Sequence, residues 1–381
     1  METVSITECK TYHYPEVEKA VFACLGQLAG LREKVKSGSR VLVKVNLLKK
    51  NVPEDAVTTH PTVVEAIVRY LQASGCRVVI GDSPGGPFNE KRLAGIYKAT
   101  GMLEVAARTG CDLNYDTTAV TVANEQARQL KHMQIIKIAA DVDFVVSAAK
   151  CKTHGMMVFT GAVKNLFGVI PGLTKAEYHF KMNNRENFAH HLLDICEYIR
   201  PVFSVIDAVE GMEGDGPSAG EKRQAGLILA GENPYALDTA AAHIIGIDPF
   251  YVPTIKIARE RGIFSGEVKD LSVKGPALEE LQIAPFKLPA SLNESLLSGV
   301  VPRTVEKFLI NILRAKPVFH YATCIGCGEC ARGCPAGIID MSTGKPLPDL
   351  KRCISCFCCH ELCPRQAVTI KKHWLHRLVF K

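Results

Sequence analysis

The 381-residue sequence lacks the features of a membrane-spanning or exported chain. No uninterrupted apolar stretch approaches the roughly 20 residues that a membrane-spanning helix needs. The first segment, METVSITECK, has no apolar run behind its charged residues and does not look like a signal peptide. From these two absences we expect a soluble protein of the cytoplasm without a transmembrane segment.

Signatures of nucleotide and nucleic-acid binding are also missing. The chain has no Walker A motif, and no G-x-G-x-x-G follows an expected strand. Basic residues are dispersed except in the tail KKHWLHRLVFK, and no zinc-finger, RNP-like or obvious helix-turn-helix pattern occurs. We therefore expect no nucleic-acid partner.

Cysteine, by contrast, is abundant, with 15 residues in the chain. Residues 324–335 read CIGCGECARGCP, and residues 353–364 read CISCFCCHELCP. Each segment contains the spacing C-x2-C-x2-C-x3-C-P, and in the second segment only Cys358 falls outside it. Two-residue gaps let one tight loop place three soft thiolate ligands around a cubane. The two motifs therefore predict iron–sulfur clusters.

Disulfides and zinc are the alternative explanations for these cysteines. A disulfide framework needs an oxidising compartment, which the N-terminal segment does not indicate. Zinc accepts C-x2-C pairs, but it gives no reason for two triplets that are each followed by Cys-Pro. Clusters are the preferred interpretation, and Cys358 is expected to be a small thiol that binds no metal.

The segment 317–371 resembles a bacterial-type two-cluster ferredoxin domain. In that arrangement the cysteine before the proline ligates the other cluster. The resemblance implies two [4Fe-4S] clusters, and two oxidised clusters would bring the formal net charge from +7 to about +3. The implied ligands are Cys324, Cys327, Cys330 and Cys363 for one cluster and Cys353, Cys356, Cys359 and Cys334 for the other.

The first 290 residues alternate short apolar runs with helical patterns, which is typical of a mainly parallel sheet covered by helices. A βαβ unit is expected from RVLVKVNLL (40–48), PTVVEAIVRYLQASG (61–75) and RVVIGD (77–82). Further strands are expected at 143–150, 201–207 and 225–231, and further helices at 159–172, 187–199 and 233–246. The predicted fold class is α/β with a small C-terminal ferredoxin-type domain.

Four parts are expected along the chain: an α/β domain at 1–290, a linker with an amphipathic helix at 291–316, the ferredoxin-type domain at 317–371 and a basic, aromatic tail at 372–381. The linker helix either docks the cluster domain or closes the large domain. The tail carries the only tryptophan, and it is either a docked terminus or a membrane or partner contact.

Polar side chains gather where the expected strands end, which is the ligand-binding edge of an open parallel sheet. Each alone is more often a solvated strand end, but together they indicate a cleft. We expect one anion site there, lined by Lys44, Lys150, Lys152 and Lys164. The strand-end candidates are Lys44, Asn46, Asp82, Ser83, Lys150, Lys152, His154, Asp207, Glu210, Glu213 and Asp215.

The expected helix 159–172 carries an i, i+3, i+4, i+7 apolar stripe that should pack inward. Lys164 and Asn165 fall off this stripe. They are either ordinary helix surface or part of the cleft. The stripe is formed by Val163, Leu166, Phe167 and Ile170.

Four segments, in order, resemble the family called domain of unknown function 362, whose members are often fused to a two-cluster ferredoxin. They are VLVKVNLL, HPTVVEAIVRYLQASGCRVVIGDSPGG, KCKTHGMMVFTGAVKNLFGVIPGLTK and DAVEGMEGDGPSAGE. The resemblance implies a redox-linked prokaryotic protein and supplies no substrate. Its motif positions here are Lys44, Asn46, His60, Asp82, Lys150, His154, Lys164, Asn165, Asp207 and the Gly214–Gly220 loop.

The leading hypothesis is an iron–sulfur electron-transfer protein whose large domain binds an anionic small molecule or a partner cofactor and which exchanges electrons with a donor or acceptor protein. Lysines would fix negative charge, His154 or His60 would move a proton, and Asp207 or Asp215 would hold a divalent metal or act as a base. The expected catalytic residues are Lys150, His154, Lys164 and Asp207.

Two other classes stay open: a non-catalytic iron–sulfur adaptor and a metal-dependent enzyme without a redox step. An enclosed pocket with a cluster near its mouth would favour an enzyme, whereas a flat surface near the clusters would favour an adaptor. The sequence does not fix the oligomeric state.

Overall fold

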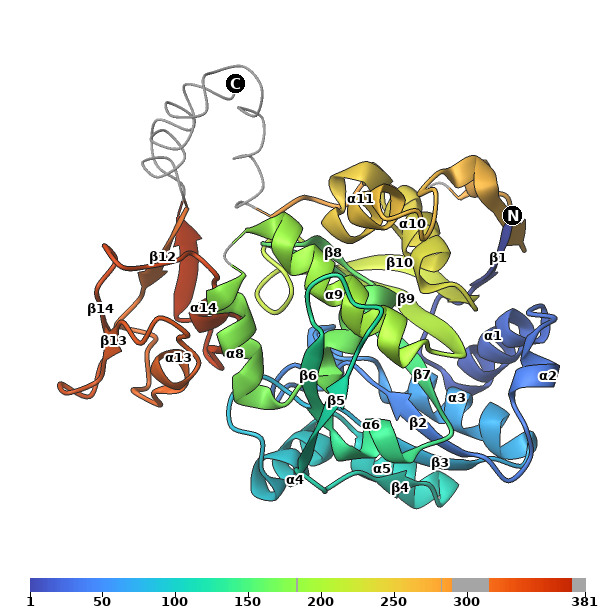
Figure 1. The fold of residues 1–381 in the computed structure, drawn as a ribbon, viewed down its shortest axis with the longest axis horizontal. Coiled ribbons are helices and arrows are strands. Elements are labelled where there is room, and N and C mark those ends of the chain that lie inside the picture. The colour runs from blue at the N-terminus through green and yellow to red at the C-terminus, as the bar shows by residue number, and fades with distance from the viewer. Residues whose placement is uncertain (183, 282, 290–314, 372–381) are drawn as a thin grey trace.

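The computed structural model describes residues 1–182, 184–281, 283–289 and 315–371. Its centre is a nine-stranded sheet of order β11-β1-β10-β9-β7-β2-β3-β4, with β8 paired to β7 (Figure 1). β2, β3, β4, β7 and β9 are parallel, whereas β10 and β1 continue the sheet in antiparallel pairs. The fold is α/β with a mainly parallel sheet, as predicted. The strands are β1 (Glu2–Glu8), β2 (Arg40–Lys44), β3 (Arg77–Gly81), β4 (Asp112–Leu113), β7 (Phe144–His154), β8 (Val158–Thr160), β9 (Phe203–Glu213), β10 (Glu221–Gly231) and β11 (Leu271–Lys274).

Helices cover both faces of the sheet because successive strand residues point to opposite sides. On one face Val41 and Val43 belong to the core shared with α1 (Tyr14–Gly26), α3 (Pro61–Ala73), α4 (Glu90–Ala99) and α5 (Met102–Thr109). On the other face Leu42 belongs to the core shared with α7 (Ala162–Asn165), α9 (Arg185–Ile199), α10 (Pro234–Ile244) and α11 (Pro253–Glu260). The remaining helices before residue 290 are α2 (Leu31–Lys34), α6 (Lys137–Asp141), α8 (Gly172–Lys181) and the 3-10 turns η1 (Pro53–Asp55), η2 (Leu166–Val169), η3 (Pro249–Tyr251), η4 (Val268–Asp270) and η5 (Leu278–Glu280).

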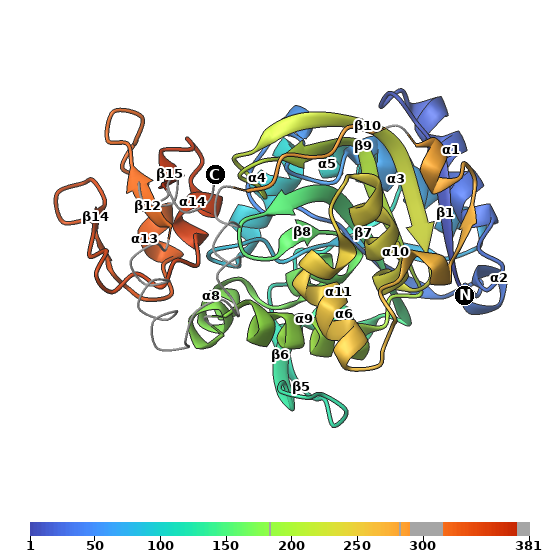
Figure 2. The same cartoon turned by 90° about the horizontal axis from the view of Figure 1, so that it is seen from above.

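A hairpin of β5 (Ala119–Ala123) and β6 (His132–Ile136) projects from the large domain (Figure 2). It forms a separate two-stranded sheet. It lies away from the edge of the main sheet at which the ligand candidates gather.

The expected helix 159–172 is wrong as a single helix. The chain there forms β8, then the single turn α7, then η2, because β8 pairs with the end of β7. The apolar stripe nevertheless packs inward, with Val163, Leu166, Phe167 and Ile170 all buried. Burial was therefore predicted correctly from a pattern that named the wrong local structure.

The small domain contains two short antiparallel pairs and two short helices. β12 (Lys316–Phe319) pairs with β15 (Val368–Lys371), and β13 (Ile339–Asp340) pairs with β14 (Leu347–Pro348). The helices α13 (Glu329–Arg332) and α14 (Cys358–Leu362) each contain the third cysteine of one motif, Cys330 and Cys359. The predicted linker helix and tail lie outside the described residues.

The small domain sits beside α8, against loops that follow the carboxyl ends of β2, β3, β7 and β9 (Figures 1 and 2). The edge of the sheet that should bind a ligand therefore faces the cysteine-rich domain. Within the described part of the chain, no helix combines the length and the apolar character needed to cross a bilayer.

Candidate functional site

The end of β2 places a buried lysine beside a buried aspartate. The Lys44 ammonium lies 3.0 Å from Asp82 Oδ1 and donates to Asn165 Oδ1 at 2.9 Å. Burial lowers the pKa of Lys44, and the Asp82 carboxylate opposes that shift. Asp82 Oδ2 also accepts a hydrogen bond from the Leu47 backbone at 2.8 Å. Lys44 is thus a paired charge that joins β2 to the end of β3.

Asn165 connects this pair to its surroundings. Its amide donates to the Lys44 carbonyl and to Ser147 Oγ, both at 3.0 Å. Its Oδ1 also accepts from Asn46 at 3.2 Å, so Lys44 and Asn46 share one partner. Asn165 is 3 % exposed, which rules out the ordinary helix surface that the sequence left open.

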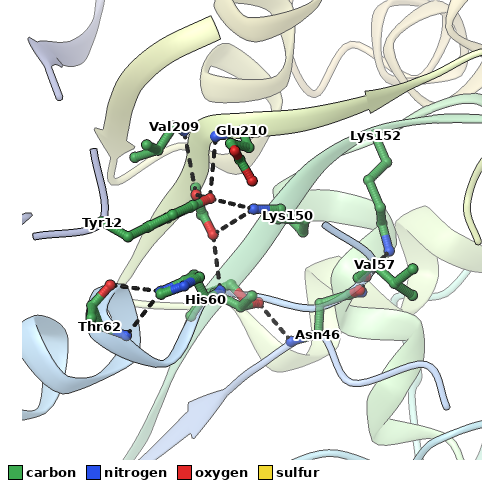
Figure 3. A network of polar contacts seen from close by, with 12 residues as sticks. Tyr12, Asn46, Val57, His60, Thr62, Lys150, Lys152, Val209 and Glu210 are labelled. Carbon is green, nitrogen blue, oxygen red and sulfur yellow. Dashed lines mark hydrogen bonds and ion pairs between the residues drawn. The ribbon is translucent and has the colours of Figure 1, made fainter. Parts of the chain in front are cut away.

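Asn46 in turn holds Lys152, which donates to Asn46 Oδ1 at 2.7 Å and to the Val57 carbonyl at 2.6 Å (Figure 3). Burial lowers the pKa of Lys152 well below its ordinary value, and the nearby charge of Lys164 lowers it further. The two hydrogen bonds of Lys152 tie the end of β7 to Asn46 and Val57.

A cavity of about 100 Å³ lies directly beyond this network, between the two domains. From the large domain come groups at the strand ends, on α7 and on α8, including Asp82, Ser83 and Lys164. From the small domain come Gly333, Cys358, Glu361 and Leu362. A side chain at Gly168 would clash with Asp82 Oδ1 at 2.1 Å, so only glycine allows η2 to close over the paired charges.

Two further lysines line the cavity. Within the described residues, Lys164 makes no hydrogen bond or ion pair, although the Glu361 carboxylate is near enough to raise its pKa against the lowering caused by burial. Lys175 donates to the Ser83 carbonyl. Burial lowers the pKa of Lys175 to about 7, and the charges of Lys44 and Lys164 act in the same direction. The cavity therefore has positive charge that protein groups do not fully balance.

Besides Asp82 Oδ1, which is ion-paired with Lys44, two buried polar atoms on the cavity wall have no hydrogen-bond partner among the described residues. They are Ser83 Oγ and His179 Nδ1, in side chains that are 1 % and 6 % exposed. The His179 ring is held by Phe188, at 4.5 Å between ring centroids, and by Phe167 at 5.7 Å. Burial lowers the pKa of His179 to about 3, so the ring is neutral. Orphaned buried polar groups of this kind call for a partner from outside the chain.

The predicted site of four lysines is wrong for two of them, because neither Lys150 nor Lys152 lines the cavity. Lys150 lies on the opposite face of the sheet from Lys44. Lys150 follows Val146 and Ala148, which belong to the core under α1 and α3, whereas Lys44 follows Leu42, which belongs to the other core. Strand alternation separates the two ammonium groups although both strands end at the same edge. Lys150 does not line the cavity.

Lys150 belongs instead to a closed network that includes Tyr12 and His60 (Figure 3). Its ammonium lies 2.9 Å from Asp207 Oδ2 and 2.6 Å from the Tyr12 hydroxyl, which donates to Asp207 Oδ1 at 2.9 Å. The His60 backbone donates to Asp207 Oδ2 at 2.9 Å, and the His60 ring stacks on Tyr12 at 3.6 Å. Burial lowers the pKa of His60 to about 4. This network is satisfied internally and ties the start of α3 to β7 and β9.

His154, at the end of β7, reaches the small domain. Its Nδ1 accepts hydrogen bonds from the backbone of Met156 and Met157 at 3.0 and 3.2 Å, so the neutral ring carries its proton on Nε2. That Nε2 lies 3.4 Å from Glu361 Oε1. Burial lowers the pKa of His154 well below its ordinary value, and the charge of Lys164 adds to the effect. His154 therefore faces the cavity wall through Glu361.

Lys49 makes a second polar contact across the domain boundary. Its ammonium is 2.8 Å from the Cys363 carbonyl and 3.2 Å from Ser218 Oγ. Burial lowers the pKa of Lys49 to about 8. Ser218 Oγ donates to the Glu361 carbonyl at 3.0 Å, and Arg92 forms an ion pair with Glu329 at 2.9 Å. The small domain is thus docked by specific bonds on both cysteine segments.

The eight predicted ligand cysteines form two groups that agree with crossed ligation. One small cavity is lined by Cys324, Cys327, Cys330 and Cys363. In the second group, burial raises the pKa of Cys359 well above its ordinary value, and nearby Cys356, Cys353 and Cys334 raise it further. In both groups the cysteine before proline thus lies with the triplet of the other motif.

The two cysteine loops also have matching backbones. Gly326 and Ser355 occupy the same motif position with φ of 70° and 54°, and each donates its N–H to the first cysteine sulfur at 3.4 Å. Gly328 and Phe357 match in the same way, with φ of 73° and 62°. Thiolate ligands with backbone amides directed at sulfur fit iron–sulfur cubanes.

No group of three or more His, Cys, Asp or Glu side chains in the described ranges is arranged to hold a single metal ion. Asp215 instead contributes its backbone carbonyl to the domain boundary, 3.3 Å from His360 Nε2. The divalent metal expected near Asp207 and Asp215 therefore has no supporting geometry.

Residues of the site that were absent from the sequence-based candidates include Tyr12, Lys49, Lys175, His179 and Glu361. Lys49 lies in the loop after β2, shortly after Lys44 and Asn46. A search for polar residues that continued a few positions beyond the strand end would have included it. Lys175 and Glu361 carried no signal of their own, because they reach the cavity only through the folding of α8 and the docking of α14.

Two family models match separate parts of this chain. The model described as domain of unknown function (DUF362) matches residues 41–243, and the 4Fe-4S dicluster domain matches residues 316–364. The dicluster match supports an iron–sulfur protein, in agreement with the cysteine geometry.

Known proteins with overall similarity add little about activity. A protein of Synechocystis sp. named thylakoid-associated protein is 31 % identical over 324 residues, covering 84 % of this chain and 98 % of that protein. The lactate racemase apoprotein from Thermoanaerobacterium thermosaccharolyticum has 12 % identity and a TM-score of 0.41, covering 65 % of this chain and 58 % of that one. A protein from Thermotoga maritima has 13 % identity and a TM-score of 0.34, covering 60 % of this chain and 57 % of that one. Neither structural likeness supports a functional inference, and the chain belongs to the DUF362 family, with a 4Fe-4S dicluster domain at its C-terminal end.

Proposed function

We propose that the protein is an electron-transfer protein with two [4Fe-4S] clusters that exchanges electrons with an anionic ligand in the interdomain cavity. Cys324, Cys327, Cys330 and Cys363 would hold one cluster, and Cys353, Cys356, Cys359 and Cys334 the other. The clusters would supply one-electron chemistry at low potential. The protein's own residues bind the ligand, exclude water and position a proton.

The observation that carries this proposal is the composition of the cavity wall. Cys358 and Glu361 line the cavity, and both belong to α14, the helix that also carries Cys359. The same short helix therefore faces the ligand site and one proposed cluster. A ligand at the strand ends would lie against the segment that ligates iron, which is the arrangement that electron exchange needs.

The cavity geometry favours this function over the two alternatives. An adaptor would present a flat surface near the cysteines, whereas here both domains enclose a cavity with orphaned polar groups. An enzyme that uses a divalent metal without redox chemistry would need a ligand set that the described residues do not form.

The cavity residues have distinct roles in this proposal. Lys164 attracts the ligand's negative charge, and Lys44 with Asp82 fixes the floor of the cavity. Glu361 faces the cavity and His154 lies behind it, with Nε2 3.4 Å from Glu361 Oε1, so the two form the pair that holds or moves a proton. Lys150 and Asp207 position the strand ends and do not touch the ligand.

A soluble donor or acceptor protein would exchange electrons with the clusters, since the clusters need a redox partner besides the ligand in the cavity. We place the protein in the cytoplasm. The name of the Synechocystis relative includes thylakoid association, so the alternative is a protein bound at a membrane surface. Fractionation of cells into soluble and membrane pools distinguishes the two locations.

The function is tested by reducing anaerobically purified protein, removing the reductant and following cluster absorbance as candidate anionic oxidants are added. A ligand that enters the cavity should reoxidise the clusters, and Lys164→Met should slow that reaction. Equal rates in the wild type and Lys164→Met for every oxidant would contradict electron exchange in the cavity.

A further inference from the structure

We infer that the cavity binds the carboxylate of a small organic acid, with Lys164, Ser83 and His179 holding the carboxylate group. This inference rests on the proposed function and specifies the ligand class for the same site. Three independent features of the cavity lead to it: its unbalanced charge, its unused hydrogen-bonding groups, and its size and apolar wall.

The charge balance identifies a single fixed cation for the ligand. Lys44 is paired with Asp82, and Lys152 already donates to Asn46 and Val57. Lys175 is engaged by the Ser83 carbonyl. Lys164 alone among these lysines has no hydrogen bond or ion pair within the described residues, although the Glu361 carboxylate on the same wall acts on it at longer range. The wall thus carries three lysines, Lys44, Lys164 and Lys175, against two carboxylates, Asp82 and Glu361. One excess positive charge matches a monoanion, and a carboxylate is the common organic monoanion.

Neutral donors beside Lys164 complete a place for the two carboxylate oxygens. Ser83 Oγ is a hydroxyl that can donate, and His179 Nδ1 can donate in one tautomer. Both are buried on the cavity wall without a partner in the described chain. A carboxylate would satisfy both atoms, whereas water alone would leave the Lys164 charge unpaired.

The ten-residue helix α8 adds its N-terminal dipole to the same wall. Its first two residues, Gly172 and Leu173, line the cavity. The N-cap residue is Pro171, and no side-chain hydrogen bond caps this end of the helix. The first N–H groups of a helix lack partners within it and favour a nearby anion. α8 therefore acts in the same direction as Lys164.

Size and apolar lining decide between a small organic acid and larger or inorganic anions. One water needs about 10–15 Å³ of such volume, so the cavity of about 100 Å³ holds roughly seven to ten atoms. A nucleotide or flavin needs far more room than this volume and would have to extend out of the cavity into solvent. Leu48, Phe167, Leu173 and Leu362 form the rest of the wall, and they suit the carbon skeleton of an acid better than a fully hydrated phosphate.

The test is anaerobic calorimetry on the full-length protein with its clusters in place. Acetate and propionate are compared with their neutral isosteres acetamide and propionamide and with inorganic phosphate. The carboxylates should bind at least about tenfold more tightly than the amides, because a hydrogen bond to a charged group is worth roughly that factor or more. Phosphate should bind more weakly than propionate.

Lys164→Met should weaken propionate binding by about 10- to 100-fold while leaving iron content unchanged. The matched control is Lys181→Met, which removes an exposed lysine from α8 and should leave binding as in the wild type. Ser83→Ala is a smaller change in the same wall and should weaken binding several-fold. It keeps the test valid if Lys164→Met loses iron.

The inference is overturned if wild-type protein binds carboxylates no better than amides, if phosphate binds more tightly than propionate, or if Lys181→Met weakens binding as much as Lys164→Met. The proposed function still holds after any of these outcomes if another anionic oxidant reoxidises the clusters and Lys164→Met slows that reaction. Conversely, carboxylate binding that leaves cluster reoxidation unchanged overturns the function and keeps the site.

Discussion

At the scale of single residues, Cys358 is the cysteine of the second motif that falls outside the ligand spacing, and it lines the cavity. Cys358 is 7 % exposed, lines the interdomain cavity and contacts Cys356, whereas Cys359 lies with Cys356, Cys353 and Cys334. The spacing alone predicted that Cys358 is the residue left over, and the structure adds where its thiol goes.

Cys358→Ala should therefore leave about eight irons and eight sulfides per chain, as two cubanes require. Cys359→Ala should lower that content because it removes a proposed ligand. Iron and sulfide analysis of anaerobically purified protein measures both. Loss of a cluster from Cys358→Ala together with full content in Cys359→Ala would show that the assigned register is wrong.

Lys49 places a positive charge from the large domain on the backbone of Cys363. A nearby cation favours the reduced, more negative state of a cluster, so Lys49→Met should lower the reduction potential of the cluster that Cys363 ligates. The expected shift is on the order of tens of millivolts. Lys50→Met removes the neighbouring exposed lysine and is the matched control. Redox titration followed by electron paramagnetic resonance would refute this role if the two variants gave equal potentials.

At the scale of secondary-structure elements, one buried ion pair joins β2 to the end of β3. Lys44 and Asp82 are 1 % and 3 % exposed; Lys44 also donates to Asn165 Oδ1, and Asp82 also accepts from the Leu47 backbone N–H. A buried pair of this kind is costly to break because the remaining charge stays buried.

Lys44→Met should destabilise the holoprotein by about 3–5 kcal/mol, because it leaves the Asp82 carboxylate buried without its cation. Lys10→Met, which removes an exposed ion pair with Glu8 of 3.6 Å, should change stability by less than about 1 kcal/mol. Urea unfolding followed by circular dichroism compares the two. Equal stability of Lys44→Met and wild type would mean that the pair does not hold the strand ends.

The α8 lysine Lys175 should make ligand binding depend on pH. Burial lowers its pKa to about 7, and Asp82, Lys44 and Lys164 are the charged groups that act on it. A bound anion favours the charged ammonium and raises this pKa, so binding takes up a proton at pH values near and above 7. The affinity for propionate should therefore fall as the pH rises through this range.

Calorimetry in two buffers with different ionisation enthalpies measures the proton uptake directly. Lys175→Met should show neither the uptake nor the fall in affinity, while Lys181→Met should keep both. A pH dependence that survives in Lys175→Met would assign the titration to another group.

Several elements were predictable from the sequence because local signals agreed with tertiary packing. α3 begins at Pro61 and ends just before Gly75, which has a φ of 80°, as the flanking residues predicted. The segment 159–172 failed because β8 pairs with β7, a contact that the apolar spacing of one segment does not encode. Alternation along β7 was likewise available, and applying it would have separated Lys150 from Lys44.

At the scale of the whole molecule, the two domains together form one cavity. The contact between Lys49 and Cys363 joins residues 314 positions apart, and the contact between Ser218 and Glu361 joins residues 143 apart. No local pattern predicts such pairs. The cysteine motifs and the strand-end residues were each predictable, but their convergence depends on how α14 docks over the carboxyl edge of the sheet.

This convergence is the central claim, because it makes the ligand site and one cluster parts of a single functional unit. A negative charge bound in the cavity should disfavour reduction of the cluster whose ligand Cys359 lies beside Cys358, and should act far less on the cluster held by Cys324, Cys327 and Cys330. Lys164→Met should abolish the effect because it removes the ligand's fixed cation.

The most direct test is a redox titration of the full-length protein with and without saturating propionate, followed by electron paramagnetic resonance. The account predicts that one of two midpoint potentials falls on binding while the other stays, and that acetamide or propionamide shifts neither. Bound propionate that leaves both potentials unchanged would contradict the coupling of the cavity to the clusters.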